Sequence, residues 1–247
     1  MRFPAAEWKG DGLSGGSFVV SAPKRLIFHT TETEGVPSYG GGASAPHLTY
    51  YVQRRRWVQH SSLAHAARAL RNLSGGVETN RQGSLQVEIV CYSDKSVADK
   101  KPSRLWVGNL PQYAYNDLAE FAAWCIVELG VRNVVRLPRP TPKYGVDSPA
   151  RMAPLEWNVF NGFAGHFEVP ENTHWDPGAF DFERLVVLVA DILDPYKDIP
   201  FWDDVSSWAK SAWKRAYDAG LVKSNTQPGA RMTKEEFFVF LERLGVI

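Results

Sequence analysis

Two histidines and an aspartate lie close together in one short segment of the chain. His166, His174 and Asp176 fall within eleven positions, among prolines and glycines that predict a loop rather than a helix face. Imidazole and carboxylate groups are good zinc ligands, and three protein ligands plus an open position make a catalytic zinc site. An aspartate before Pro177 is also typical of a plain turn, so this segment alone leaves both interpretations open.

A further histidine stands far upstream. The run KRLIFHT, over residues 24–30, predicts a buried strand that ends with His29. A lone histidine at a strand end is more often satisfied by hydrogen bonds within the protein than by a metal. The spacing of the whole set, rather than His29 alone, makes it a candidate ligand.

Five segments of the chain together resemble the type-2 N-acetylmuramoyl-L-alanine amidases, which share a fold with the peptidoglycan recognition proteins. The segments are IFHTTE, APHLTYYV, LAHAAR, SLQVEIV and GHFEVPENTHWDPG, and the resemblance covers about residues 22–182. The last segment is the most specific. It begins with Gly-His, a basic residue follows eight positions after this histidine, and the segment ends with Asp-Pro-Gly. The resemblance implies zinc-dependent hydrolysis of the amide between N-acetylmuramic acid and L-alanine in peptidoglycan. The size of the chain and its small tail also resemble a bacteriophage endolysin.

The resemblance implies a zinc site with His29, His166 and Asp176 as ligands, the last where some relatives carry cysteine. Zinc suits the chemistry, because an amide is a poor electrophile and zinc both polarises a carbonyl and lowers the pKa of water. The alternative is that His174 is itself a ligand and that Asp176 only shapes the turn.

The resemblance also implies roles beside the metal. Glu88 matches a strand glutamate that takes a proton from the attacking water, and His174, where many members have lysine, could stabilise an oxyanion. His65 resembles a histidine that lines the substrate groove. Pro46 departs from the family, because some phage members place a catalytic tyrosine there, and this puts more weight on Glu88. From the residues alone, Glu88 could also point to solvent, and His65 could lie on an ordinary helix surface.

The elements that would position these residues alternate between extended and helical patterns. Strands are expected over residues 24–30, 48–53, 56–60 and 84–91, the middle two as a hairpin, and helices over 63–70, 115–129 and 182–193. Strands interleaved with helices predict an α/β fold, with a central mixed β-sheet flanked by helices.

The composition changes beyond Pro200, where two amphipathic helices are expected as a small C-terminal helical module. We therefore expect a zinc amidase domain over residues 1–195 and a small helical domain over 196–247. The helical domain resembles one repeat of a surface-layer-homology-like module, which implies binding to the cell wall. A packing or dimerising pair of helices is the alternative.

The overall composition is that of an ordinary globular protein. A net charge of +1 argues against a nucleic-acid partner, and no apolar stretch is long enough to span a membrane. The N-terminus lacks the apolar run of a signal peptide, so we expect the chain to be made in a host cytoplasm and to act on the wall after release. Cys91 and Cys125 are expected to be buried free thiols.

Two other functions remain open at this stage. A peptidoglycan recognition protein without catalysis would only bind the wall, but such proteins typically lack a zinc ligand, and all three candidates are present. Another zinc hydrolase acting on wall peptides is the second alternative. Release of muramic-acid-linked ends, rather than new peptide ends, would distinguish it from an amidase.

Overall fold

The computed structural model describes residues 1–19, 25–194, 214 and 218. The chain divides into two compact units, Met1–Ala190 and Asp191–Ile247, and the architecture below is that of the first. The predicted tail helices and the predicted domain boundary after residue 195 lie outside the described residues. Among the described helices, none has the length and apolar character needed to cross a membrane.

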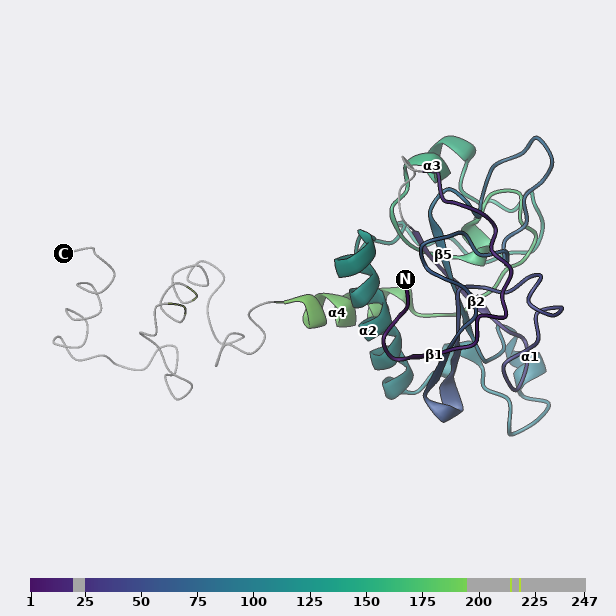
Figure 1. The fold of residues 1–247 in the computed structure, drawn as a ribbon. Helices are drawn as coiled ribbons and strands as arrows, with labels where there is room; N and C mark the ends of the chain where they lie inside the picture. Colours follow the sequence, from purple (N-terminus) through teal and green to yellow (C-terminus); the bar gives the residue numbers. More distant parts are fainter. Residues whose placement is uncertain (20–24, 195–213, 215–217, 219–247) are drawn as a thin grey trace, which may run out of the picture. The chain divides into compact units, whose positions relative to one another are not determined.

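Six strands form one mixed sheet in the order β1-β4-β3-β5-β2-β6 (Figure 1). They are β1 Ala6–Trp8, β2 Arg25–Thr30, β3 Leu48–Tyr51, β4 Arg56–Gln59, β5 Ser84–Ile89 and β6 Gly162–Gly165. In this sheet β3 and β4 pair antiparallel, and the other neighbouring strands pair parallel. The predicted α/β fold with a central mixed sheet is confirmed, as is the predicted hairpin.

Helices pack around this sheet. In the described part of the chain they are α1 Lys95–Ala98, α2 Gln112–Leu129, α3 Pro154–Val159 and α4 Phe182–Leu193. The α4 helix has its predicted bounds, and α2 starts three positions before its predicted start at residue 115. As predicted, α2 ends at Gly130, whose left-handed backbone (φ 72°) suits a residue without a side chain. Cys91 and Cys125 are buried free thiols, also as predicted.

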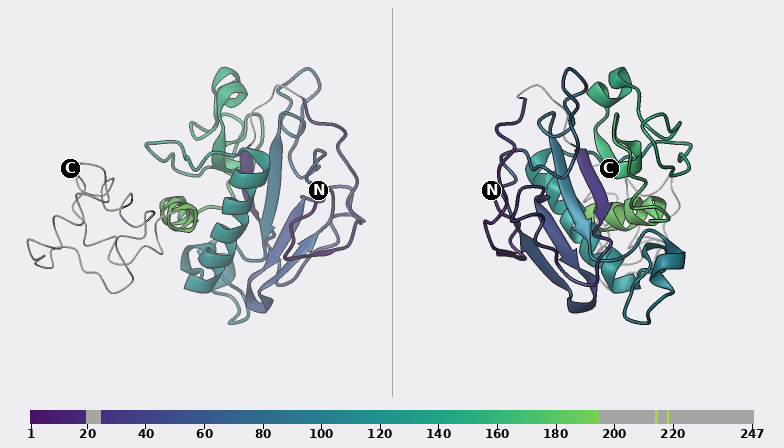
Figure 2. Two further views of the ribbon diagram at one scale, coloured as in Figure 1. Left: turned by 60° about the vertical axis from the view of Figure 1, so that its left-hand side comes forward. Right: turned by 90° about the vertical axis from the view of Figure 1, so that its right-hand side faces the viewer.

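One face of the sheet packs against helices. Registered residues of parallel strands point to the same side, so Phe28 of β2 and Val87 of β5 share this face. The hydroxyl of Tyr50 donates to Asp117 of α2 at 2.5 Å, and Phe28 packs against Phe182 of α4 with ring centroids 5.5 Å apart. Figures 1 and 2 show α2 lying along this face, which contains the main apolar core.

The opposite face is apolar at one end and polar at the other. Ile27 packs there in a small cluster with Trp157 of α3, and the Arg25 guanidinium lies 4.1 Å from the centroid of the Trp157 ring. Toward the carboxyl ends of the strands, the same face carries His29 and its register partner Glu88. The alternation along β2 and β5 therefore places polar side chains on the face that α2 does not cover.

Residues 63–70 do not form the predicted helix, and this prediction was wrong. The His65 N–H donates to the carbonyl of Ser62, but this turn does not continue as a helix, because later N–H groups bond to distant segments. The Ala66 N–H donates to the carbonyl of Gly16, and the Arg68 N–H donates to the carbonyl of Ala45. The alanine-rich composition reflects close packing against these segments, because small side chains allow two backbones to approach.

Candidate metal centre

The predicted site residues gather at the carboxyl edge of three parallel strands. His29 lies near the end of β2, Glu88 lies opposite it on β5, and His166 directly follows β6. The carboxyl ends of parallel strands are a usual place for a site in an α/β sheet. Asp176 comes from the loop after His166 and completes the group from a different direction.

His29, His166 and Asp176 each turn one ligand atom toward a common point. The Nδ1 atoms of the two histidines lie 3.1 Å apart. Asp176 Oδ1 lies 3.1 Å from His166 Nδ1, and the other carboxylate oxygen, Oδ2, lies 3.4 Å from His29 Nδ1. In a tetrahedral zinc site with bonds of about 2.0–2.1 Å, ligand atoms lie about 3.3–3.4 Å apart. All three side chains are buried, and their donor atoms fit a zinc ion in number, type and separation.

A hydrogen bond determines which nitrogen of His166 is available as a ligand. Asn172 Nδ2 donates to the carbonyls of Arg71 and Pro170, so its Oδ1 is an acceptor. His166 Nε2 lies 3.0 Å from this Oδ1 and must therefore carry the hydrogen. The lone pair is left on Nδ1, which faces the other two ligand atoms. Such support of a ligating histidine is a regular feature of metal sites.

The surroundings keep two of the ligands deprotonated. Burial, followed by the neighbouring His166, lowers the pKa of His29 to about 4. Burial alone would raise the pKa of Asp176, but His166 and His29 outweigh it and lower that pKa well below its ordinary value. Metal binding requires neutral imidazole and ionised carboxylate, so both groups are ready to bind a metal at neutral pH.

Glu88 is buried rather than exposed to solvent, with 9% of its surface accessible. Its Oε2 atom has no hydrogen-bond partner among the described residues. Burial raises the pKa of Glu88 well above its ordinary value, and the carboxylates of Asp176 and Glu32 raise it further. A raised pKa makes the Glu88 carboxylate a stronger base for a proton beside the ligand group.

His174 lies at the rim of the ligand group. Its ring stacks on His166 with centroids 4.9 Å apart and planes at 6°, and 62% of its side chain is exposed. Its Nδ1 is 3.7 Å from Asp176 Oδ1. Burial, followed by His166, lowers the pKa of His174. Because Asp176 rather than His174 joins the buried group of ligand atoms, the geometry favours Asp176 as the third ligand.

His65 lies outside the ligand group. It is exposed, and its carbonyl accepts a hydrogen bond from His47 Nε2 at 2.7 Å. Its predicted contact with substrate stays a prediction.

Sequence reasoning missed Arg151, which holds the histidine-bearing loop from outside. Its guanidinium donates to the carbonyls of His166 (2.9 Å), His174 (2.5 Å) and Gly145 (3.2 Å). Burial lowers the pKa of Arg151 to about 10, so it remains charged at neutral pH. No residue pattern could have revealed this role, because the partners are backbone carbonyls. Asn172 was missed for a similar reason, since it donates to the carbonyls of Arg71 and Pro170, and Glu32 was missed because its partner Ser93 is distant in the sequence.

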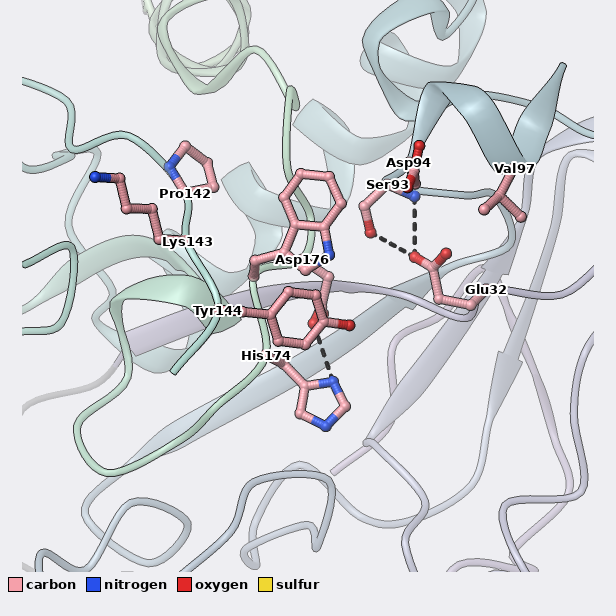
Figure 3. Close-up of a pocket in the computed structure, with 10 residues that line it drawn as sticks. Glu32, Ser93, Asp94, Val97, Pro142, Lys143, Tyr144, His174 and Asp176 are labelled. Carbon is pink, nitrogen blue, oxygen red and sulfur yellow. Dashed lines mark hydrogen bonds and ion pairs between the residues drawn. The ribbon is translucent and has the colours of Figure 1, made fainter. Parts of the chain in front are cut away.

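A cavity of about 460 Å³ opens beside Asp176 and His174 (Figure 3). Figure 3 shows Glu32, Ser93 and Asp94 on one side and Lys143 and Tyr144 on the other. The complete lining is Glu32, Ser93, Asp94, Val97, Pro142, Lys143, Tyr144, His174, Trp175 and Asp176. The cavity offers space for a ligand next to the candidate metal centre.

No family model and no curated protein matches the chain. Among solved structures, it is similar to the Staphylococcus aureus hydrolase AmiA in complex with its ligand, at 14% identity and a TM-score of 0.45, over 76% of this chain and 83% of that one. It is also similar to a selenomethionine derivative of AmpD, at 14% identity and a TM-score of 0.45, over 76% of this chain and 96% of that one. At this sequence identity and TM-score, the similarities carry no argument about activity.

Proposed function

We propose that the chain is a zinc-dependent N-acetylmuramoyl-L-alanine amidase, which hydrolyses the amide between N-acetylmuramic acid and L-alanine in bacterial peptidoglycan. One observation carries the proposal: His29, His166 and Asp176 converge at separations near those of a tetrahedral zinc site. The buried carboxyl group of Glu88 lies on the neighbouring strand. The five sequence segments that resemble type-2 amidases support the substrate class.

The residues divide the chemistry between them. His29, His166 and Asp176 would hold zinc, which supplies a Lewis acid that polarises the amide carbonyl and makes water more acidic. Glu88 accepts a proton from the attacking water on a carboxylate oxygen and passes it to the leaving amine. His174 donates a hydrogen bond from a ring nitrogen to the oxyanion that develops on the carbonyl. The oxygen of water ends on the muramic acid carboxylate, and the peptide leaves with the amino group of L-alanine free.

The biological setting is part of the same proposal. We infer that the chain is a bacteriophage endolysin, made in the host cytoplasm and acting on peptidoglycan after its release. The support for this setting is the small helical domain predicted over residues 196–247, which resembles a wall-binding module.

Mass spectrometry of digested, purified peptidoglycan tests the function directly. The full chain should release glycan with free muramic acid carboxyl groups and peptides that begin with free L-alanine. A chelator should abolish this release, and added zinc should restore it. New ends within the peptides would instead identify another zinc hydrolase. Binding to the wall without any new ends would identify a recognition protein.

A further inference from the structure

We propose that the cavity beside Asp176 and His174 is a saccharide subsite, in which Tyr144 stacks on a pyranose ring and Glu32 accepts hydrogen bonds from its hydroxyl groups. The inference rests on the proposed function, since it assigns the sugar side of the substrate to this cavity. The cavity volume of about 460 Å³ is within the range of about 300–1,000 Å³ usual for small-ligand sites.

Aromatic rings form one wall of the cavity. Tyr144 is 67% exposed, and its ring centroid lies 6.1 Å from that of Trp175 and 6.4 Å from that of His174. An aromatic ring presents a flat apolar face that can cover the C–H face of a sugar, and a tyrosine hydroxyl can bond to water or ligand at the edge. An exposed tyrosine beside a second aromatic side chain is therefore suited to a pyranose.

The loop that carries Tyr144 is fixed to the metal centre. Arg151 donates to the carbonyls on both sides of Tyr144, at 3.4 Å to Lys143 and 3.2 Å to Gly145. The same guanidinium donates to the carbonyls of His166 and His174. The tyrosine is thus held at a defined position relative to the candidate ligands, as a binding platform must be.

The opposite wall carries a fixed carboxylate. Glu32 has a left-handed backbone (φ 55°), a region that non-glycine residues rarely occupy and that occurs more often at functional sites. Its Oε1 accepts hydrogen bonds from Ser93 N–H (2.9 Å), from Thr30 Oγ1 (2.6 Å) and from the Ser93 hydroxyl. Within the described residues, these bonds all go to Oε1. The Oε2 atom is therefore left as an acceptor for a ligand.

The charges of the lining favour a sugar over a peptide stem. Besides the proposed zinc ligand Asp176, Glu32 and Asp94 contribute two carboxylates to the lining, against the ammonium group of Lys143. Stem peptides of peptidoglycan carry carboxylates of their own, which this wall would repel. Sugar hydroxyl groups are neutral hydrogen-bond donors, and carboxylates are strong acceptors for them. The combination of an aromatic platform and opposing carboxylates is complementary to a hydroxyl-rich ring.

The test measures binding of two probes to the full chain by calorimetric titration. One probe is the uncharged disaccharide of two N-acetylglucosamine units, and the other is a free stem peptide that begins with L-alanine. Tyr144→Ala and Glu32→Gln should each raise the dissociation constant of the disaccharide by about three- to tenfold, from the usual worth of one stacking or charged hydrogen-bond contact. The affinity for the stem peptide should not change.

Two matched controls use exposed residues of α2, which lies on the other face of the sheet. Tyr113→Ala and Glu128→Gln should leave the disaccharide affinity unchanged. Weaker binding of the stem peptide in the cavity variants, with unchanged disaccharide binding, would make the cavity a peptide subsite and overturn the proposal. Failure of the unaltered chain to bind the disaccharide would also overturn it.

Neither probe contains the bond that the enzyme would cleave, so this result does not depend on hydrolysis. If the chain binds the disaccharide through Tyr144 but does not cleave peptidoglycan, the subsite is supported and the proposed function is refuted. A chain that cleaves peptidoglycan, with no loss of disaccharide binding in either variant, would refute the subsite alone.

Discussion

Glu88 and His29 face the same side of the sheet from neighbouring strands, yet Glu88 is not among the converging ligand atoms. Turnover should therefore depend on Glu88 while metal binding does not. Glu88→Gln keeps the shape of the side chain and removes the base, and it should lower the rate of muropeptide hydrolysis by about a hundredfold or more. Zinc content, measured by elemental analysis, should stay at the level of the unaltered chain. Full activity in this variant would show that another group moves the proton.

The ligand set makes a separate prediction about metal content. One zinc ion should bind per chain, and His166→Ala should lose it, because two ligands remain and the support from Asn172 is removed with the ring. His65→Ala is the control, since His65 is exposed and lies outside the ligand group. Undiminished zinc in the His166→Ala protein would contradict the assignment.

His174 should affect the rate without affecting the metal. Its pKa is lowered by burial and by His166, so it is neutral at neutral pH and can act as a hydrogen-bond donor. His174→Ala should lower the rate by about two to three orders of magnitude, the usual effect of losing one oxyanion donor. Zinc should remain bound in this variant and be lost from Asp176→Ala. The reverse pattern of zinc content would make His174 the ligand and Asp176 a turn residue.

At the scale of elements, strands and helices with a regular apolar pattern could be predicted from the sequence, and short elements without such a pattern could not. β5 alternates because one of its two buried sides faces the apolar core and the other is polar, and α4 has a helical stripe because it buries one side, so both leave a periodic signal in the sequence. The strand β6, with the sequence GFAG, has four residues, all buried and two of them glycine, so it carries no alternation. The helix predicted over residues 63–70 fails because tertiary hydrogen bonds replace those within a helix turn.

The sequence predicted those site residues whose side chains are typical metal ligands. His29, His166 and Asp176 stand in recognisable motifs, and the fold brings their ligand atoms together. Arg151 acts through carbonyl groups, and Tyr144 acts through a loop whose position depends on Arg151. Such roles come from contacts between distant segments, for which a single sequence gives no signal.

A network of hydrogen bonds joins β3 to three loop segments and should make stability depend on pH. The ring nitrogens of the buried His60 lie 2.7 Å from Asp11 Oδ1 and 3.0 Å from Thr49 Oγ1, which lies 2.7 Å from the Tyr39 hydroxyl. Burial lowers the pKa of His60 and outweighs the opposing effect of Asp11. In the pH range below the ordinary value of about 6.5, the unfolded chain therefore binds a proton that the folded chain does not, and stability falls.

The measurement compares the unaltered chain with His60→Gln by denaturant unfolding, both with a chelator present. The chelator prevents zinc release by the ligand histidines from contributing to the pH dependence, and the remaining histidines contribute equally to both proteins. The unaltered chain should have the higher free energy of unfolding at about pH 8, and its advantage should shrink as the pH falls from about 6.5 toward 5. A difference that stays constant over this range would show that His60 does not titrate differently in the folded chain.

At the scale of the whole molecule, the two faces of the described sheet have different roles, one in stability and the other in the proposed chemistry. The face that packs on α2 and α4 contains the main apolar core, and the opposite face carries His29 and Glu88, with His166 and Asp176 brought beside His29 from the segment after β6. All six histidines and both cysteines of the chain precede residue 195, so residues 196–247 offer no imidazole or thiol to a metal centre. We predict that these residues determine where the proposed enzyme acts rather than how it reacts.

This division predicts the result of removing the tail. A chain that ends at Pro195 keeps α4, which ends at Leu193, and should cleave soluble muropeptides at the rate of the full chain. It should bind insoluble walls less well in a sedimentation assay, because residues 196–247 are predicted to bind the wall. Both chains should carry Glu88→Gln in that assay, so that the walls are not digested while binding is measured. Equal wall binding by a folded, truncated chain would refute the targeting role. Failure of the truncated chain to fold would show instead that residues 196–247 stabilise the rest of the chain.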